Sequence, residues 1–433
     1  MSSKTELKEL LVRTLKDEIE KSTGCTDPGA TCLAAARAVL ELGVTPEKIV
    51  ITVSPNVYKN GVSVGVPGTG KRGLAIAAGL GCFIGHSETG LDILNYVTPE
   101  AIELANSMVA EGRVRVTYAE FPNPLYVRAE VFSGKETAAA VISGDYSNIV
   151  HVSRNGNTVM EKPVKEQEEA VGVLIPYKLK DFYDIIIESP ADDFRFLLEY
   201  ADINRAAAEL GLTDEGMSYG KKLRSYESEY KEGAQRIAHD ARTLTAAAGE
   251  ARMLGLIVPI MAIAGSGNHG ITNFLGTSVV AYDLNADEEH TIKALAISSM
   301  LTVYTKEYIK RMTAFCGCSV AAATGVSAAA VYLLGGTYEQ GILAINSLVG
   351  TLGGMFCDGA KESCAYKLST ATMMAIQFAY MAVDDCGLPE GIGVVGNTIE
   401  DTFYNLGQLN NFGMRETDRM IVQLIERTED QKR

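Results

Sequence analysis

Hydrophobic and polar residues alternate differently in the two halves of the chain. Residues 4–21 mix charges with regularly spaced leucines, which predicts an amphipathic surface helix. Residues 49–54 alternate like a strand, and residues 71–80 predict a helix after a glycine-rich turn. From about residue 178 onward the pattern becomes helical almost throughout. The two halves therefore predict different architectures.

Short strands dominate the end of the first half. Four apolar runs are separated by turn sequences such as F-P-N-P and R-N-G-N, at residues 113–119, 125–132, 137–143 and 148–153. Consecutive strands with short turns predict an antiparallel meander. Charged residues 161–171 predict a linker. We expect an α+β protein in which a small mixed α/β domain (1–170, with a helical segment 1–45 free to pack elsewhere) joins a helical domain (171–433).

Two long stretches, 253–282 and 312–338, carry no Asp, Glu, Lys or Arg. Each is long enough to span a bilayer, so a membrane transporter is one alternative. Polar residues 265–273 interrupt the first stretch, however, and residues 314–330 are mostly Ala, Gly, Ser, Cys and Thr. Small residues let helices approach closely, so we expect a closely packed helical bundle outside the membrane.

Composition narrows the choice of partners. The 433 residues carry a net charge of −15, which argues against nucleic-acid or anionic-membrane binding, since both need a basic face. The N-terminus shows no basic segment followed by an apolar run, so we predict a cytoplasmic protein. A small-molecule partner fits these features, and assembly into a homo-oligomer is left open.

A glycine-rich loop raises the question of nucleotide binding. Residues 65–71, G-V-P-G-T-G-K, match a phosphate-binding loop, but Arg72 occupies the position of the Mg²⁺-binding Ser or Thr. No later apolar strand ends in the Asp that would complete the metal site. Backbone N–H groups in such a turn can bind a carboxylate as readily as a phosphate. We therefore interpret the loop as a carboxylate cradle or a packing turn.

A second glycine-marked turn, S-T-G-C-T-D-P-G-A, precedes a predicted helix over residues 29–42. Thr26 or Asp27 can cap this helix, and Pro28 suits its first turn. Cys25 then lies just before the helix N-terminus, a position that lowers the pKa of a thiol. The thiolate could act as a base, a nucleophile or a metal ligand, and a cysteine without a role is the alternative.

Four more cysteines fall into two short motifs, at Cys316, Cys318, Cys357 and Cys364. Their spacing fits neither a zinc site nor a ferredoxin. On an unbroken helix, residues seven apart have Cα atoms about 10 Å apart, too far to share one ion. A bend at Asp358-Gly359 would bring Cys357 and Cys364 within reach of a cluster. Three thiolates on a four-iron cluster leave one iron open as a Lewis acid.

Several motifs now resemble one family. They are "GCTDP", "VPGTGKRGLAIAAGLG", "CGCSVAAATGVSAAAVYLLGG" and "MFCDGAKESCAYKL", and they span roughly residues 20–400. They resemble the L-cysteine desulfidase family, which is related to the alpha part of bacterial iron–sulfur L-serine dehydratases. The resemblance implies a small α/β domain joined to a helical catalytic domain. It also implies a [4Fe–4S] cluster and non-redox β-elimination from a small amino acid, without pyridoxal phosphate.

The resemblance also implies roles for single residues. The cluster ligands would be Cys357, Cys364 and Cys318, with Cys316 as the alternative to Cys318, because the context G-C-S-V-A-A-A-T-G matches the dehydratase motif better. Cys25 falls on the family's N-terminal cysteine, a candidate base or mobile fourth ligand. Asp27 stands where the family usually has Glu, which leaves the substrate less certain than the reaction type.

The expected chemistry needs a base at the Cα–H bond and a group that stabilises the leaving atom at Cβ. Two glycine-rich stretches offer donors for the substrate carboxylate: Gly68, Thr69, Gly70, Ser266, Asn268 and His269. For His269 a hydrogen-bonded core histidine is an equal alternative. L-Serine or L-threonine dehydration and a non-catalytic cluster protein are the competing functions. A pyridoxal-phosphate enzyme is disfavoured, since Lys361 is a poor anchor.

Overall fold

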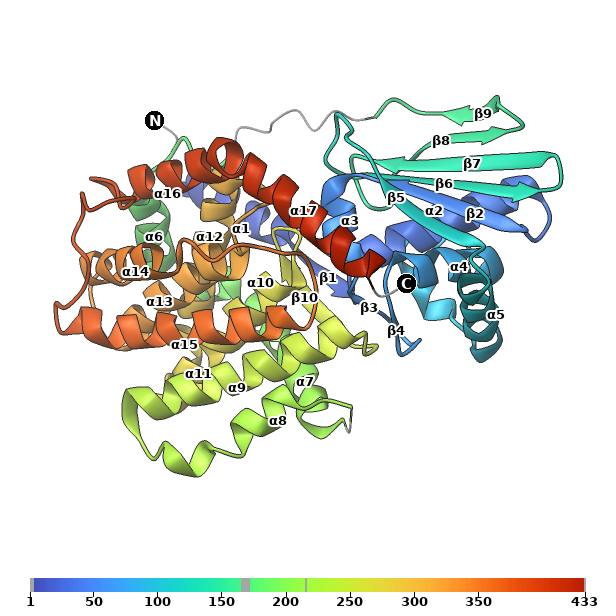
Figure 1. Cartoon of the computed structure of the whole chain (residues 1–433). Coiled ribbons are helices and arrows are strands. Elements are labelled where there is room, and N and C mark those ends of the chain that lie inside the picture. Colours follow the sequence, from blue (N-terminus) through green and yellow to red (C-terminus); the bar gives the residue numbers. More distant parts are fainter. Residues whose placement is uncertain (1–3, 165–171, 215, 432–433) are drawn as a thin grey trace.

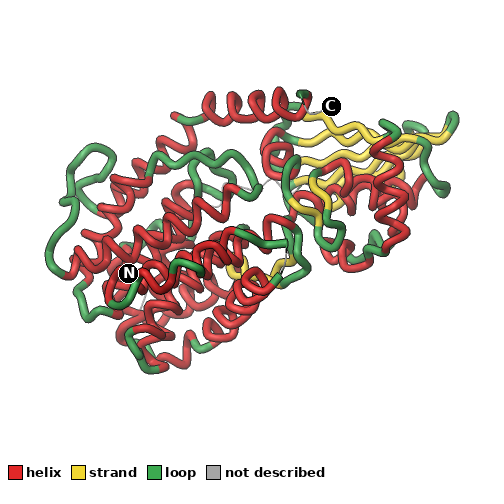
Figure 2. Tube along the Cα trace, turned by 60° about the horizontal axis from the view of Figure 1, so that its bottom comes forward, coloured by secondary structure: helices red, strands yellow, loops and turns green. Residues whose placement is uncertain are grey.

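The structure is a computed structural model that describes residues 4–164, 172–214 and 216–431. A mixed sheet lies at one end, and helices make up most of the rest (Figures 1 and 2). The predicted α+β class is therefore confirmed. Most of the predicted linker, residues 165–171, lies outside the described residues.

The main sheet has six strands in the order β5-β2-β6-β7-β8-β9. Of the four strands predicted to form the meander, β6, β7 and β8 are antiparallel neighbours, and the unpredicted β9 extends them. The first predicted strand, β5, instead pairs with β2 in parallel and not with β6. Helices connect β2 to β5, and such a crossover makes strands parallel. The strands are β2 (Lys48–Val53), β5 (Val114–Tyr118), β6 (Tyr126–Ser133), β7 (Glu136–Ser143), β8 (Ile149–Arg154) and β9 (Asn157–Glu161).

The alternating pattern of β2 explains its central place. Ile49, Ile51 and Val53 are fully buried, while the residues between them are not. Helix α2 covers this face of the sheet, and α4 packs against α2 and α5. The helices of this part of the chain are α2 (Thr26–Leu42), α3 (Pro55–Gly61), α4 (Leu74–Ile84) and α5 (Pro99–Ala110). We call residues 26–161, which include this sheet and its helices, the sheet region.

In the rest of the chain, helix α13 packs against α11, α12, α14 and α15. Small residues allow this close approach: a Cβ atom on Gly325 would lie 2.3 Å from the carbonyl oxygen of Ser298. We call residues 172–408 the helical region. Its longer helices are α6 (Leu179–Glu188), α7 (Phe196–Thr213), α9 (Gly233–Leu254), α11 (Gly276–Asp283), α12 (Glu288–Ile309), α13 (Ala323–Leu333), α14 (Tyr338–Leu352), α15 (Ser363–Val383) and α16 (Ile399–Gln408).

The first charge-free stretch is not one helix. It contains the end of α9, strand β10 (Pro259–Ile263), the short helix α10 (Gly267–Gly270), a π-helical turn and α11. Within the described residues, no helix is both long and apolar enough to cross a membrane.

Both ends of the chain cross between the two regions. Helix α1 (Lys4–Glu18) packs with the helical region, and the predicted helix stops at Glu18 because β1 (Ile19–Thr23) pairs with β10. Helix α17 (Arg415–Asp430) runs along α3 (Figure 1), and its Val422 joins the sheet-region core. The domain boundary at residue 170 stays a prediction, and helices α1 and α17 each pack against the region on the other side of it.

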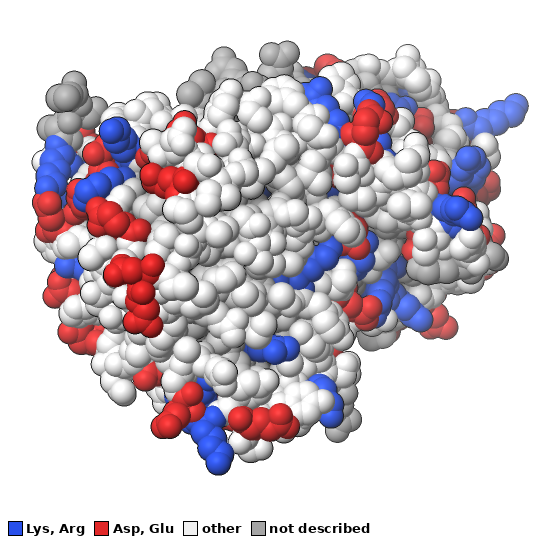
Figure 3. All heavy atoms as spheres, turned by 60° about the vertical axis from the view of Figure 1, so that its left-hand side comes forward, with Lys and Arg blue, Asp and Glu red and all other residues white. Residues whose placement is uncertain are grey.

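The surface charge is unevenly distributed. On the face shown in Figure 3, Lys, Arg, Asp and Glu lie mostly around the margins, and a broad central area carries none. This face therefore offers no continuous basic surface of the kind that nucleic acids require.

Candidate active site

Two turns that pair with each other bring the cysteines of the two C-terminal motifs together. The Cys316 N–H donates to the Met355 carbonyl at 2.7 Å, and the Cys357 N–H donates to the Ala314 carbonyl at 2.6 Å. Phe315 and Phe356 form the bridge between these bonds. Cysteines about 40 positions apart in the sequence are thereby brought together.

The predicted bend between Cys357 and Cys364 is confirmed. The chain leaves helical geometry there, Gly359 has φ +89°, and α15 begins only at Ser363. A Cβ atom on Gly359 would lie 1.9 Å from the Lys59 carbonyl oxygen, so only glycine fits this close approach. Cys364 therefore begins a helix, while Cys357 stays in the turn.

Cys316 and Cys318 are both buried and lie side by side where a π-helical turn (Cys318–Ala322) begins. A hydrogen bond from Cys318 lowers the pKa of Cys316 to about 7. The same bond, together with burial, raises the pKa of Cys318. The pair therefore gives up one proton readily while it keeps the other. Short π-helical turns often occur at functional sites.

A buried lysine faces these thiols. Lys306 of α12 is only 4% exposed, and its Nζ donates to the Arg311 carbonyl at 3.1 Å. Burial lowers the pKa of Lys306 to about 7, while the thiols of Cys357, Cys318 and Cys316 act in the opposite direction. Nothing in the sequence around Lys306 predicts that it is buried or that it lies near the cysteines.

The donor set fits an iron–sulfur cluster. Within the described residues, no three His, Cys, Asp or Glu side chains are placed to hold a single metal ion. The free thiols of the two paired turns and of Cys364, at the start of α15, are, however, the ligand type that such clusters take, and a cluster spans more space than one ion. The buried Lys306 ammonium beside them suits a negatively charged thiolate group.

Cys25 is the N-cap of α2, so its predicted place before a helix is correct, although the helix begins earlier than expected, at Thr26. The predicted lowering of its pKa is wrong. Burial and the charge of Asp27 raise the pKa of Cys25, and its thiol donates to Asp27 Oδ2 at 3.2 Å. Burial likewise raises the pKa of Asp27 to about 6, which hydrogen bonds from Cys25 and Tyr146 oppose.

The stretch 265–270 begins at the exposed Gly265 and enters the interior at α10, whose four residues are buried. His269 is 5% exposed, and its Nδ1 donates to the Ile263 carbonyl at 3.1 Å, which leaves Nε2 as the unprotonated nitrogen. Burial and the charge of Lys306 lower the pKa of His269 to about 3. A Cβ atom on Gly317 would lie 2.1 Å from Nε2, so the imidazole contacts the backbone between Cys316 and Cys318.

The two other residues predicted in this stretch differ in burial. Asn268 is 7% exposed, and its Oδ1 accepts a hydrogen bond from Arg252 at 3.1 Å. Ser266 is half-buried and precedes α10 as its N-cap, with no side-chain capping bond. The buried Arg252 comes from α9, and the sequence analysis did not identify it. Arg252 is one of three arginines in α9, and nothing in the sequence distinguishes it from Arg236 and Arg242.

The glycine-rich loop forms a tight hairpin of β3 (Gly65–Val66) and β4 (Lys71–Arg72). The Gly68 N–H donates to the Gly255 carbonyl, and the Thr69 N–H and hydroxyl both donate to the Val66 carbonyl. Two of the three predicted carboxylate donors are thus already engaged within the protein. The substrate role of Gly68, Thr69 and Gly70 stays a prediction, with less support than the sequence suggested.

The predicted residues largely converge. Cys25 and Met253 of α9 belong to one small apolar cluster, against which Cys364 packs, while the ring of His269 lies against the Cys316–Cys318 turn. The hairpin touches the end of α9, and its exposed Arg72 forms an ion pair with Glu362 at 2.5 Å. The site therefore lies where the sheet region meets the helical region.

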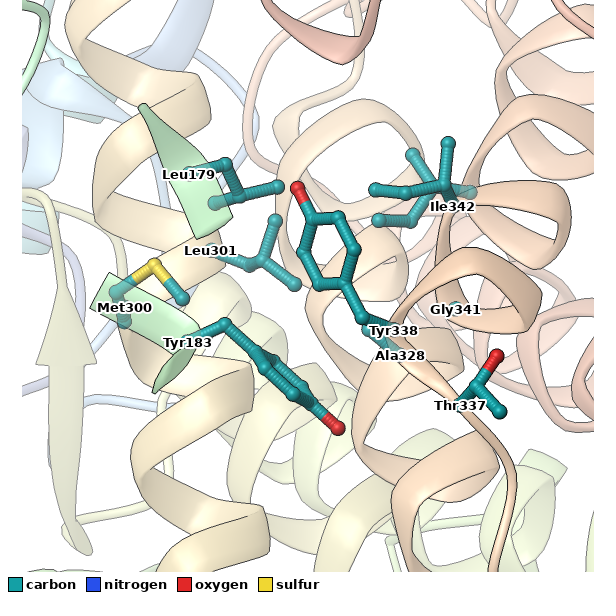
Figure 4. A pocket seen from close by; sticks show the side chains of 10 residues that line it. Leu179, Tyr183, Met300, Leu301, Ala328, Thr337, Tyr338, Gly341 and Ile342 are labelled. Carbon is teal, nitrogen blue, oxygen red and sulfur yellow. The ribbon is translucent and has the colours of Figure 1, made fainter. Parts of the chain in front are cut away.

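A separate apolar cavity lies elsewhere in the helical region, around the rings of Tyr183 and Tyr338 (Figure 4). Its volume of about 10 Å³ leaves no room for a ligand larger than water. None of the predicted site residues lines it. This cavity is therefore a packing defect beside the core.

The amino-acid sequence matches one family model over most of its length. The family model of the serine dehydratase alpha chain covers residues 88–423, so the chain belongs to this family, which is associated in general with iron–sulfur serine dehydratases. The four paired cysteines fall inside that match. Cys25 and the hairpin lie outside it.

Full-length relatives extend the similarity to the N-terminal part. A UPF0597 protein of Methanocella arvoryzae is 51% identical over 98% of this chain and 99% of its own length. A UPF0597 protein of Bacteroides thetaiotaomicron is 36% identical, over 96% of this chain and 97% of its own. The relative from Caldanaerobacter subterraneus, UPF0597 protein TTE0269, is 35% identical, over 96% and 99%.

Proposed function

We propose that this protein is an iron–sulfur-dependent carbon–sulfur lyase that converts L-cysteine into pyruvate, ammonia and hydrogen sulfide. The observation that carries the proposal is the pairing of two cysteine turns beside Cys25 and α10. Membership of the serine dehydratase alpha chain family supports lyase chemistry on a small amino acid. A cytoplasmic location and assembly into a homo-oligomer stay predictions.

Three thiolates would hold a [4Fe–4S] cluster: Cys357, Cys364 and Cys318, with Cys316 as the alternative to Cys318. When bound, the cluster supplies an open iron as the Lewis acid for the leaving group. The hydrogen bond between Cys316 and Cys318 supports an arrangement in which one sulfur is a cluster ligand and the other donates a hydrogen bond to that ligand.

Removal of the substrate's Cα proton requires a base, and Cys25 is the candidate. To accept a proton, Cys25 must first lose its own, and Asp27 Oδ2 is placed 3.2 Å away to receive it. The electron pair of the Cα–H bond then forms the double bond, while the sulfur leaves Cβ with the pair of the C–S bond. Water hydrolyses the resulting aminoacrylate to pyruvate and ammonia.

The polar residues of α10 would position the substrate. Asn268 and the neutral His269 are buried beside the cysteine turns, and half-buried Ser266 lies at the entrance to this short helix. Since the His269 Nδ1 proton is held by Ile263, only its Nε2 is left to accept a hydrogen bond from an ammonium or hydroxyl group.

Dehydration of L-serine or L-threonine is the second candidate, and the name of the matching family favours it. Hydroxide and sulfide are both leaving groups that an iron Lewis acid can accept, so the same residues would serve either substrate. A non-catalytic cluster-binding protein would keep the cysteine turns but would need no Cys25.

Anaerobic purification followed by iron and acid-labile sulfide analysis tests the cofactor first. We expect about four irons per chain, and we expect Cys357→Ser to lose most of this iron. Cys386→Ser, which alters an exposed cysteine, is the matched control and should retain it. Comparison of Cys316→Ser with Cys318→Ser then identifies the third ligand. A full cluster in Cys357→Ser would refute the assignment.

Incubation with L-cysteine, L-serine and L-threonine then decides the reaction. Pyruvate and sulfide from L-cysteine support the proposal, pyruvate from L-serine alone supports dehydration, and an intact cluster without product supports a binding role. Cys25→Ser should lower turnover by at least about 100-fold with iron content unchanged, as expected for a lost base. Loss of iron in Cys25→Ser would instead make it a ligand.

A further inference from the structure

Arg252 is a buried cation with an unused hydrogen-bonding edge. It lies in the last turn of α9 and is 6% exposed, although arginine is almost never buried without a charged partner. Among the described residues, the only hydrogen bond of its side chain runs from Nη1 to Asn268 Oδ1, and no carboxylate oxygen lies within ion-pair distance. Its buried Nε has no hydrogen-bond partner.

The guanidinium is held in place by its surroundings. A Cβ atom on Gly267 would lie 2.5 Å from Nε and 2.9 Å from Cζ, so the group lies against a residue that has no side chain. Asn268 fixes one end of the guanidinium by its bond to Nη1. The edge formed by Nε and Nη2, which matches the two oxygens of a carboxylate, makes no hydrogen bond to any described residue.

The neighbours of Arg252 are the residues of the candidate site. Its positive charge acts on Cys25, Asp27 and His269, since it lowers the pKa of each. Met253, the next residue, packs against Cys25 and Cys364. An anion bound at Arg252 would therefore lie among the candidate base, the buried histidine and the cysteine turns.

We propose that Arg252 binds the α-carboxylate of the substrate through its Nε–Nη2 edge, with Asn268 orienting the guanidinium. The inference rests on the proposed function, and it specifies that the substrate must carry a carboxylate. It moves carboxylate binding away from the hairpin, where the N–H groups of Gly68 and Thr69 already donate to backbone carbonyls. Among the described residues, Asp27 is the one carboxyl whose pKa the Arg252 charge lowers, and this carboxyl accepts hydrogen bonds from Cys25 and Tyr146.

Binding of L-alanine tests this inference without catalysis, because L-alanine has the carboxylate and amine of the substrate but no leaving group. Calorimetry on anaerobically purified protein should show that Arg252→Gln weakens L-alanine binding by about 100-fold, as expected for loss of one partner of a buried charge pair. The preference of the wild type for L-alanine over ethylamine, which lacks the carboxylate, should collapse in this variant. Arg195→Gln, which alters an exposed arginine, is the matched control and should change neither value.

Arg252→Lys keeps the charge but loses the planar fork, and we expect about tenfold weaker binding with iron content retained. If Arg252→Gln fails to fold, the binding measurement on Arg252→Lys decides the question. Wild-type affinity for L-alanine in a folded Arg252 variant overturns the inference. If the wild-type protein binds L-alanine through Arg252 but releases no pyruvate, the proposed lyase activity is refuted and the carboxylate-binding role of Arg252 is retained. If Arg252→Lys releases pyruvate at the wild-type rate and binds L-alanine with wild-type affinity, the carboxylate-binding role of Arg252 is refuted and the proposed lyase activity is retained.

Discussion

The sheet region and the helical region differ in what they bury. In β2 every second side chain is buried and apolar, as at Ile49 and Ile51. The helical region buries polar and ionisable side chains just as completely, among them Asn273, Thr302 and Lys306. A buried polar group costs free energy unless it finds a partner, so the two regions are stabilised in different ways. The sheet region serves mainly as a scaffold, although it contributes the buried Asp27, and the helical region holds most of the groups that the proposed chemistry requires.

The largest effect should come from the apolar scaffold. Ile51→Ala removes a fully buried side chain from the centre of the sheet and should lower the free energy of unfolding by about 3 kcal/mol. Urea denaturation measures this loss. Lys48→Ala, at the exposed start of the same strand, is the control and should change stability by less than about 0.5 kcal/mol. A loss below about 1 kcal/mol in Ile51→Ala would show that the sheet core is loosely packed.

An intermediate effect should come from a half-buried carboxylate in the helical region. Burial raises the pKa of Glu307 to about 7, although its Oε2 accepts N–H groups of Leu174 and Ile175. The folded state therefore holds a proton that the unfolded chain releases near pH 4.5. The stability that Glu307 contributes is greatest below that pH and is lost as the pH rises to about 7.

Glu307→Gln mimics the protonated carboxyl group and should therefore remove the loss of stability that the wild type shows as the pH rises to about 7. Its melting temperature relative to wild type should rise between pH 5 and pH 7.5, by the equivalent of about 2 kcal/mol after allowance for partial exposure. Glu103→Gln, on the exposed face of α5, is the control. A constant difference across this pH range would show that Glu307 ionises normally in the folded protein.

The smallest effects should separate satisfied from unsatisfied hydroxyl groups in the same core. Thr302 donates to the Ser298 carbonyl and accepts from Asn273, whereas the equally buried Thr277 hydroxyl has no partner among the described residues. Thr302→Val should cost about 1.5 kcal/mol, and Thr277→Val should stabilise by about 1 kcal/mol. Unfolding curves that shift in the same direction for both variants would contradict this distinction.

Periodicity along the chain predicted the elements that rest on local patterns. Strands β2 and β6 to β8 and the helix after Cys25 lie within a few residues of their expected positions. It missed β9, which follows the last predicted strand. It also missed β1 and β10, because their pairing joins residues more than 230 positions apart and leaves no local trace. It also could not show that β2 would separate β5 from β6.

The candidate site was predictable only in part, for a related reason. Cys25, Asn268 and the paired cysteines carry their chemistry in the residue type, so the sequence alone identified them as candidates. Arg252 and Lys306 have ordinary charged side chains, and only burial by distant segments distinguishes them. The donors of the hairpin were predicted to be free, but hydrogen bonds to the carbonyls of Val66 and Gly255 engage two of them.

Helix α17 has a consequence for the order of assembly during synthesis. It follows every other described element along the chain, yet it packs on α3 and forms an ion pair between Asp418 and the buried Lys59. The backbone of Lys59 in turn contacts Gly359, in the bend between Cys357 and Cys364. Domains fold as they emerge from the ribosome, so the bend gains its final support only after residues 415–430 have been translated.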